Sequence, residues 1–80
     1  MVVKDVVKQI CEAGRFIKGS KEADAIHHAV TSVYGSEYRP VTKQSTMRYG
    51  SKIERNLYEH DSKIANRAVR HVRSVIRNLK

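Results

Sequence analysis

The last nineteen residues, SKIANRAVRHVRSVIRNLK (Ser62–Lys80), carry the clearest structural pattern in the chain. Apolar side chains recur on one face when each residue is turned by about 100° along a helix. The pattern predicts an amphipathic helix over residues 62–78, capped by Asp61 or Ser62. The apolar face holds Ile64, Ala65, Ala68, Val69, Val72, Val75, Ile76 and Leu79, and the polar face holds Lys63, Asn66, Arg67, Arg70, Arg73, Ser74 and Arg77.

Two helices are predicted in the first half of the chain. The apolar stripe of VVKDVVKQI predicts a helix over about residues 2–13, with Gly14 in the left-handed conformation that commonly ends a helix. A second helix is predicted over about residues 21–34, because Ser20 is a suitable N-cap and Gly35 a suitable end.

The middle of the chain has sparse apolar spacing. We therefore expect two short helices, over about residues 42–48 and 51–58, separated by Gly50. No strand-like alternation or internal repeat is present in the sequence. The predicted fold class is all-α, a compact bundle of about five helices that contains a helix-turn-helix with a long basic C-terminal recognition helix.

The length of 80 residues and a hydrophobic content of 40% predict one domain over residues 1–80 with one small core. The helices of residues 1–40 form its scaffold, and residues 51–78 form the helix-turn-helix. The net charge of +8 is concentrated in the second half of the chain. Residues 1–40 hold six Lys or Arg against five Asp or Glu, a net +1, and residues 41–80 hold ten against three, a net +7. This asymmetry indicates a polyanionic partner.

The basic face of the helix over residues 62–78 differs from an ordinary solvated face, which mixes charges of both signs. Its aligned positive charges repel one another and have no acidic residue within the segment to offset them. Arginine can bind a phosphate, or the O6 and N7 atoms of guanine, with two parallel hydrogen bonds. Asn66 adds a side chain of the type that pairs with adenine. The pattern favours sequence-specific binding of double-stranded DNA, with this helix in the major groove.

The sequence also resembles a known family, the DNA-binding effector domain of the sporulation response regulator stage 0 sporulation protein A. The similar stretches are VVKDVVKQI, FIKG, AIHHAV and SKIANRAVRH, which resembles the family's recognition-helix pattern SRVERAIRH. Two departures are one additional residue between SKI and RAVRH, and Asn66 where the family has glutamate. The resemblance implies a transcriptional regulator in which Arg67 reads a base, Lys63 lies near a second base-reading position, and Arg70 and His71 approach phosphates.

The residues are assigned to two roles from these observations. Base reading is expected of Lys63, Asn66 and Arg67, and phosphate binding of Lys52, Arg70, His71, Arg73, Ser74 and Arg77.

Other functional classes have weaker signals in the sequence. No catalytic motif or Gly-rich phosphate loop is present, so we expect no enzyme and no cofactor. The adjacent His27 and His28 point about 100° apart on a helix, which is unsuitable for joint metal binding, so no metal site is expected. The single cysteine, Cys11, cannot form an internal disulfide, and no segment is apolar enough for a membrane span. These features predict a cytoplasmic protein.

Alternatives stay open at this point. The charge alone equally permits an RNA-binding or non-specific nucleic-acid-binding module, or a protein-interaction domain that docks on an acidic partner. Tyr38 precedes Arg39 and Tyr49 follows Arg48, so both rings could stack on unpaired bases, although tyrosines of a small domain more often pack in its core. Binding as a homodimer or as tandem copies on repeated half-sites is also open.

Overall fold

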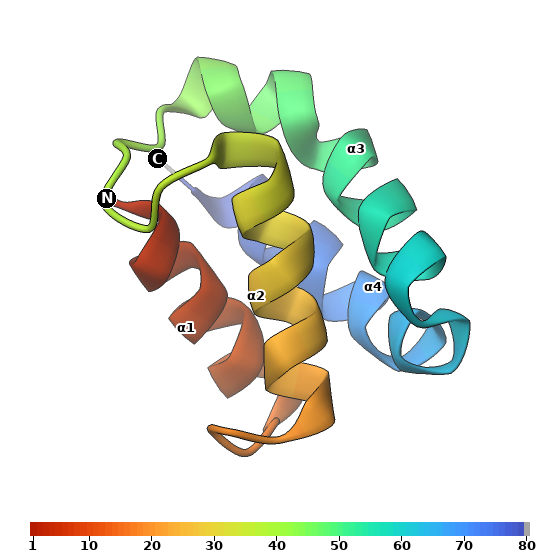
Figure 1. Cartoon of the computed structure of the whole chain (residues 1–80). Helices are drawn as coiled ribbons and strands as arrows, with labels where there is room; N and C mark the ends of the chain where they lie inside the picture. Colours follow the sequence, from red (N-terminus) through yellow and green to blue (C-terminus); the bar gives the residue numbers. More distant parts are fainter. Residues whose placement is uncertain (80) are drawn as a thin grey trace.

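The computed structural model describes residues 1–79, which contain four α-helices and the segments that connect them (Figure 1). They are α1 (Val3–Gly14), α2 (Lys21–Tyr34), α3 (Lys43–His60) and α4 (Ser62–Asn78). Outside the helices, one isolated bridge pairs Val2 with Pro40. The all-α class is confirmed, with four helices in these residues rather than about five. Lys80, the last basic residue of the C-terminal segment, lies outside the described residues.

Helices α1, α2 and α4 match the predicted ranges to within one residue, and side-chain caps explain where α2 and α4 begin. The Ser20 hydroxyl accepts a hydrogen bond from the Ala23 N–H at 3.2 Å. The Asp61 carboxylate accepts from the N–H groups of Lys63 and Ile64, both at 3.0 Å. These side chains satisfy backbone donors that a helix leaves unpaired in its first turn. Gly35 ends α2 with a φ of 91°.

The end of α1 differs from the prediction. Gly14 is the last helical residue, and the left-handed conformation is adopted by Arg15, with a φ of 55°. A Cβ atom at Gly14 would overlap the ring of Phe16, which folds back over this position. A glycine is needed at position 14 because the Phe16 ring leaves no room for a side chain there, and not because of the backbone angles of Gly14.

The prediction of two short helices in the middle of the chain was wrong, because α3 is a single helix of 18 residues that passes through Gly50. Thr46 is buried in its first half, and its hydroxyl donates to the Thr42 carbonyl at 2.7 Å. Thr46 therefore continues the buried stripe that Ile53 and Leu57 form farther along the helix. A threonine in the stripe conceals its periodicity, since threonine does not count as apolar in the sequence.

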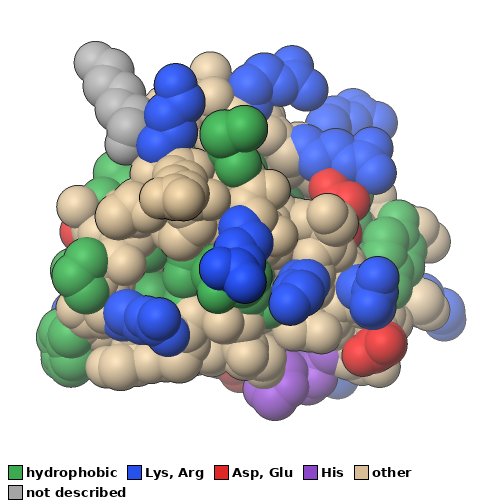
Figure 2. Space-filling model, turned by 90° about the horizontal axis from the view of Figure 1, so that it is seen from above, with side chains coloured by type: hydrophobic (Ala, Val, Ile, Leu, Met, Phe, Trp, Pro, Cys, Tyr) green, Lys and Arg blue, Asp and Glu red, His purple; other side chains and the backbone are tan. Residues whose placement is uncertain are grey.

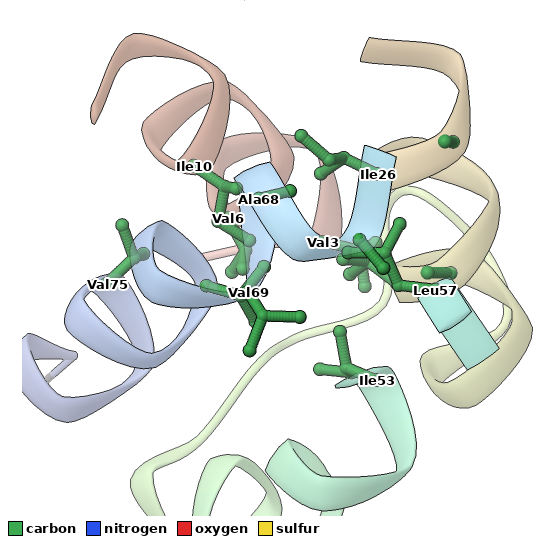
Figure 3. Packing of buried hydrophobic residues seen from close by; sticks show 14 of the residues in the cluster. Val3, Val6, Ile10, Ile26, Ile53, Leu57, Ala68, Val69 and Val75 are labelled. Atoms are coloured by element: carbon green, nitrogen blue, oxygen red, sulfur yellow. The ribbon is translucent and has the colours of Figure 1, made fainter. Parts of the chain in front are cut away.

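One hydrophobic core joins the four helices (Figure 3). Valines and isoleucines of α1 and α2 meet the inner face of α4, while Ile53 and Leu57 close the core from α3. Phe16 packs against this cluster, but its neighbour Ile17 is 77% exposed. The fully buried large side chains are Ile10, Ile26, Ile53, Leu57, Val3, Val6, Val30 and Val72.

Helices α3 and α4 run in opposite directions and are joined by one residue, Asp61. Gly50 faces Ile76, and farther along α3 the Glu54 carboxylate binds Arg73. Tyr58, near the end of α3, lies in the same groove as Val69 of α4. The two helices consequently lie alongside each other, and the polar face of α4 stays on the outside of the molecule.

Candidate nucleic-acid interface

The two faces of α4 are separated as the sequence predicts. Its inner face is buried in the core from Ile64 to Val75. The residues of the polar face are all exposed: Lys63, Asn66, Arg67, Arg70, Arg73, Ser74 and Arg77. Because the fold holds α4 by its apolar side, it fixes the direction in which the polar side chains point.

An open groove of about 470 Å³ lies between α3 and α4. On the α3 side the groove is lined by Tyr58, and its other lining residues come from α4. The groove therefore gathers several predicted site residues beside one aromatic ring, which is 43% exposed. Its lining residues are Tyr58, Asn66, Val69, Arg70, Arg73, Ser74 and Arg77.

Two arginines of the polar face have carboxylate partners on other helices, contrary to the expectation from the segment alone. Arg67 donates to Glu22 of α2 at 3.1 Å. Arg73 donates through Nε and Nη2 to the two carboxylate oxygens of Glu54, at 2.6 and 3.3 Å. The hydrogen bond to Glu54, and then the negative charge of its carboxylate, raise the pKa of Arg73 above its ordinary value. The partners lie 45 and 19 positions away in the sequence, and for this reason no local pattern reveals them.

The remaining basic residues of the face have no ion pair within residues 1–79. These are Lys63, Arg70 and Arg77. The two pairs that do form are exposed, with more than half of each arginine side chain in water. Exposed ion pairs contribute little to stability because water and salt screen them. The face therefore keeps an excess of positive charge.

Positive charge also extends beyond α4. Figure 2 shows the molecule from above the view of Figure 1, where α3 lies, with Lys and Arg side chains spread over the surface and few Asp or Glu side chains between them. The exposed basic residues of α3 are Lys43, Arg48, Lys52 and Arg55.

Two predicted phosphate-binding residues lie away from the groove. His71 is half-buried, and its ring meets the edge of Phe16 with 5.9 Å between centroids. The Lys52 ammonium lies 5.4 Å from the ring centroid of Tyr49, which packs against Tyr34 of α2. His71 thus borders the connection between α1 and α2, and Lys52 lies on the side of α3 that is nearer α2.

The tyrosines do not form a shared exposed surface. Tyr34 is buried, and Tyr49 is half-buried against it with 5.5 Å between ring centroids. Tyr38 is exposed in the connection between α2 and α3, and Tyr58 lines the groove. This arrangement lacks the row of aromatic rings on which successive unpaired bases stack.

The histidines take part in structural contacts. His27 is hydrogen-bonded to Glu37 at 2.6 Å, and the rings of His28 and His60 stack with 4.6 Å between centroids. Within residues 1–79, no three His, Cys, Asp or Glu side chains come together as metal ligands. Burial, with a smaller contribution from Glu12, raises the pKa of the half-buried Cys11 thiol.

Sequence reasoning missed Tyr58 and Glu54 as parts of this surface. Both lie on the side of α3 that faces α4, and their proximity follows from the antiparallel pairing of the two helices. The pairing could have been anticipated from the single connecting residue, had α3 been predicted as one helix.

No protein-family model, curated protein sequence or solved structure matches the chain. No helix in residues 1–79 combines the length and the apolar character needed to cross a membrane.

Proposed function

We propose that the protein binds double-stranded DNA in a sequence-specific manner through the polar face of α4 and acts in transcriptional control. The observation that carries the proposal is the gathering of Arg70, Arg73, Arg77 and Asn66 along one exposed groove. A folded domain does not need such a face for its own stability, because like charges one turn apart repel each other.

Phosphate binding accounts for most of the expected affinity. Arginine side chains donate paired hydrogen bonds to phosphate oxygens, and neutralised phosphates release their counterions. If six to eight basic residues meet phosphates, the logarithm of affinity falls with the logarithm of salt concentration at a slope of roughly −5 to −7. Ser74 lies among the arginines and offers a hydroxyl donor.

Base reading is proposed for the first turns of α4. Lys63, Asn66 and Arg67 are exposed there, and the first turns of a recognition helix contact base edges in the major groove. In this proposal α4 acts as the recognition helix and the second half of α3 as the supporting helix, although the one-residue connection between them is shorter than the turn of a typical helix-turn-helix. Asn66 borders the groove, whereas Arg67 is held from α2 by Glu22.

Double-stranded DNA is favoured over single strands by the placement of the tyrosines. Binding of unpaired bases needs several exposed rings along one path, and Tyr34 and Tyr49 are engaged with each other. The resemblance to the sporulation regulator stays a prediction. Asn66, where that family has glutamate, argues against a preference for the family's TGTCGAA-type box, and the sequence selected from random duplex tests the resemblance.

Selection from random duplex DNA at about 150 mM salt tests the proposal. We expect an enriched short motif that is bound at least about a hundredfold more tightly than scrambled duplex. Lack of enrichment, or tighter binding of structured RNA at the same salt, would contradict the proposal, and binding to neither would point to an acidic protein partner.

The two proposed roles are separated by a pair of arginine substitutions. Arg67→Ala should cost about 1 to 3 kcal/mol on the selected motif and relax preference at one base pair. Arg77→Ala serves as the comparison, and should weaken binding to all sequences equally because it removes a phosphate contact. The same uniform loss for Arg67→Ala would overturn its assignment as a base reader.

A further inference from the structure

Glu54 of α3 does not line the groove, but its carboxylate is bonded to Arg73, which does. We propose that this groove seats one phosphate group of the bound nucleic acid, and that the phosphate replaces the Glu54 carboxylate as the partner of Arg73. The inference rests on the proposed function, because it names a ligand group within the same surface.

The geometry of the pair supports an exchange of one anion for another. Arg73 presents Nε and Nη2 side by side, and both donate to the oxygens of Glu54. A phosphate accepts two parallel hydrogen bonds from a guanidinium in the same way as a carboxylate. Glu54 thus occupies the edge of Arg73 that a phosphate would use.

The two side chains of the pair differ in exposure. The Arg73 side chain is 64% exposed, whereas the Glu54 side chain is 21% exposed. The Glu54 carboxylate is thus mostly covered by the molecule, whereas the Arg73 side chain is open to water and also lines the groove. Water and salt reach the Arg73 guanidinium and screen its attraction to Glu54, so another anion can compete for it.

A phosphate in the groove would contact more cationic side chains than the Glu54 carboxylate does. A phosphate seated there lies among Arg70, Arg73 and Arg77 and near the Ser74 hydroxyl. Neither Arg70 nor Arg77 has an ion-pair partner within residues 1–79. One phosphate therefore relieves the repulsion among three guanidinium groups, whereas Glu54 neutralises only the arginine to which it is bonded.

Arg67 provides an internal contrast. It makes one hydrogen bond, through Nη2 to Glu22, and it does not line the groove. The replacement of a carboxylate by a phosphate is therefore proposed for Arg73 alone, and Arg67 remains a candidate for base reading.

The test compares Glu54→Gln with Glu12→Gln, which removes the same charge from an exposed position of α1 that has no ion pair in residues 1–79. Affinity for one labelled duplex is measured by fluorescence anisotropy at fixed salt, and thermal unfolding checks that both variants fold. We expect Glu54→Gln to tighten binding about two- to fivefold, since an internal competitor has been weakened, and Glu12→Gln to change it little.

A double-variant cycle shows whether the gain acts through Arg73. In the Arg73→Ala background, Glu54→Gln should give no gain beyond that of Glu12→Gln. A gain that persists without Arg73 would overturn the inference, because it would reflect only the removal of a nearby negative charge.

Loss of affinity in Glu54→Gln would also overturn it, since Glu54 would then be orienting Arg73 for DNA and not competing with DNA. In both cases the proposed function stands, because the unmodified protein still binds duplex. Failure of the unmodified protein to bind duplex DNA would instead overturn the proposed function, and the inference with it.

Discussion

Helices α1 and α4 are alike on the side that faces the core and different on the side that faces water. Both bury valine and isoleucine at helical spacing, and the two helices pack against each other. The exposed side of α1 alternates in sign, with Lys4, Asp5, Lys8 and Glu12. The exposed side of α4 has basic residues at five positions of the described helix and no acidic residue.

The difference shows which features of a helix the fold itself requires. A helix is held in this molecule by its apolar face, and α1 shows that a mixed outer face is compatible with such packing. The single-sign face of α4 adds no contact to the core. Two of its arginines form ion pairs with other helices, and the remaining positive charge is the feature on which the proposed function rests.

The inner faces of the helices are tested first, because their contribution to stability is the largest. Ile10→Ala should lower the free energy of unfolding by about 2 to 5 kcal/mol, since Ile10 is fully buried on α1 and its truncation leaves a cavity. Ile17→Ala is the matched control at an exposed position and should change stability by less than about 0.5 kcal/mol. Urea unfolding followed by circular dichroism measures both, and equal effects would mean that Ile10 is not packed in the core.

The outer faces are tested by charge reversal. Replacement of Arg70, Arg73 and Arg77 by Glu should weaken duplex binding by about a hundredfold or more at moderate salt, because phosphate contacts become repulsions. The control reverses Lys4, Lys8 and Lys21 on α1 and α2, which changes the net charge by the same amount. If both triple variants lose affinity equally in anisotropy titrations, net charge and not the α4 face governs binding.

The start of α4 is tested at its cap. Asp61→Ala should lower the free energy of unfolding by about 1 kcal/mol, because the N–H groups of Lys63 and Ile64 lose their acceptor. Asp61→Asn keeps a capping oxygen and should unfold almost like the unmodified protein. A comparable loss in both variants would show that the negative charge of Asp61, and not the cap, stabilises α4.

The smallest expected effect is a gain in stability within α3. Gly50→Ala should raise the free energy of unfolding by about 0.5 to 1 kcal/mol, because alanine favours a helix interior more than glycine does. A Cβ atom at this position would lie 3.7 Å from Ile76, an ordinary contact distance. Thermal unfolding measures the change, and a destabilised variant would show that α3 and α4 approach too closely at Gly50 for a methyl group.

The sequence predicts three of the four helices because their signals are local. Apolar spacing defines α1, and apolar spacing together with a side-chain N-cap defines α2 and α4, all within short windows. For α3 the sequence was misleading: Gly50 resembles a break, and the buried Thr46 does not register as a core residue. Tertiary packing against α4 outweighs the low helix propensity of one glycine.

The candidate site is predictable to the extent that it lies on one helix. Helical periodicity places Asn66, Arg70, Arg73, Ser74 and Arg77 together, and the structure puts them on one groove. Glu54 and Tyr58 join them only through the pairing of α3 with α4, which periodicity within one segment does not reveal. His71 was assigned to phosphate binding from the resemblance, yet its ring packs against Phe16.

Cys11, the single cysteine of the chain, can be used to measure the opening of α1 by thiol labelling. The raised pKa of Cys11 keeps its thiolate fraction below that of an unfolded chain, so a thiol reagent should react slowly while α1 is docked and faster when α1 opens. Cys11 lines no part of the groove. The rate of Cys11 labelling would be compared with and without duplex DNA. A slower rate with DNA would show that a ligand on α4 suppresses the opening of α1, although α1 does not line the groove.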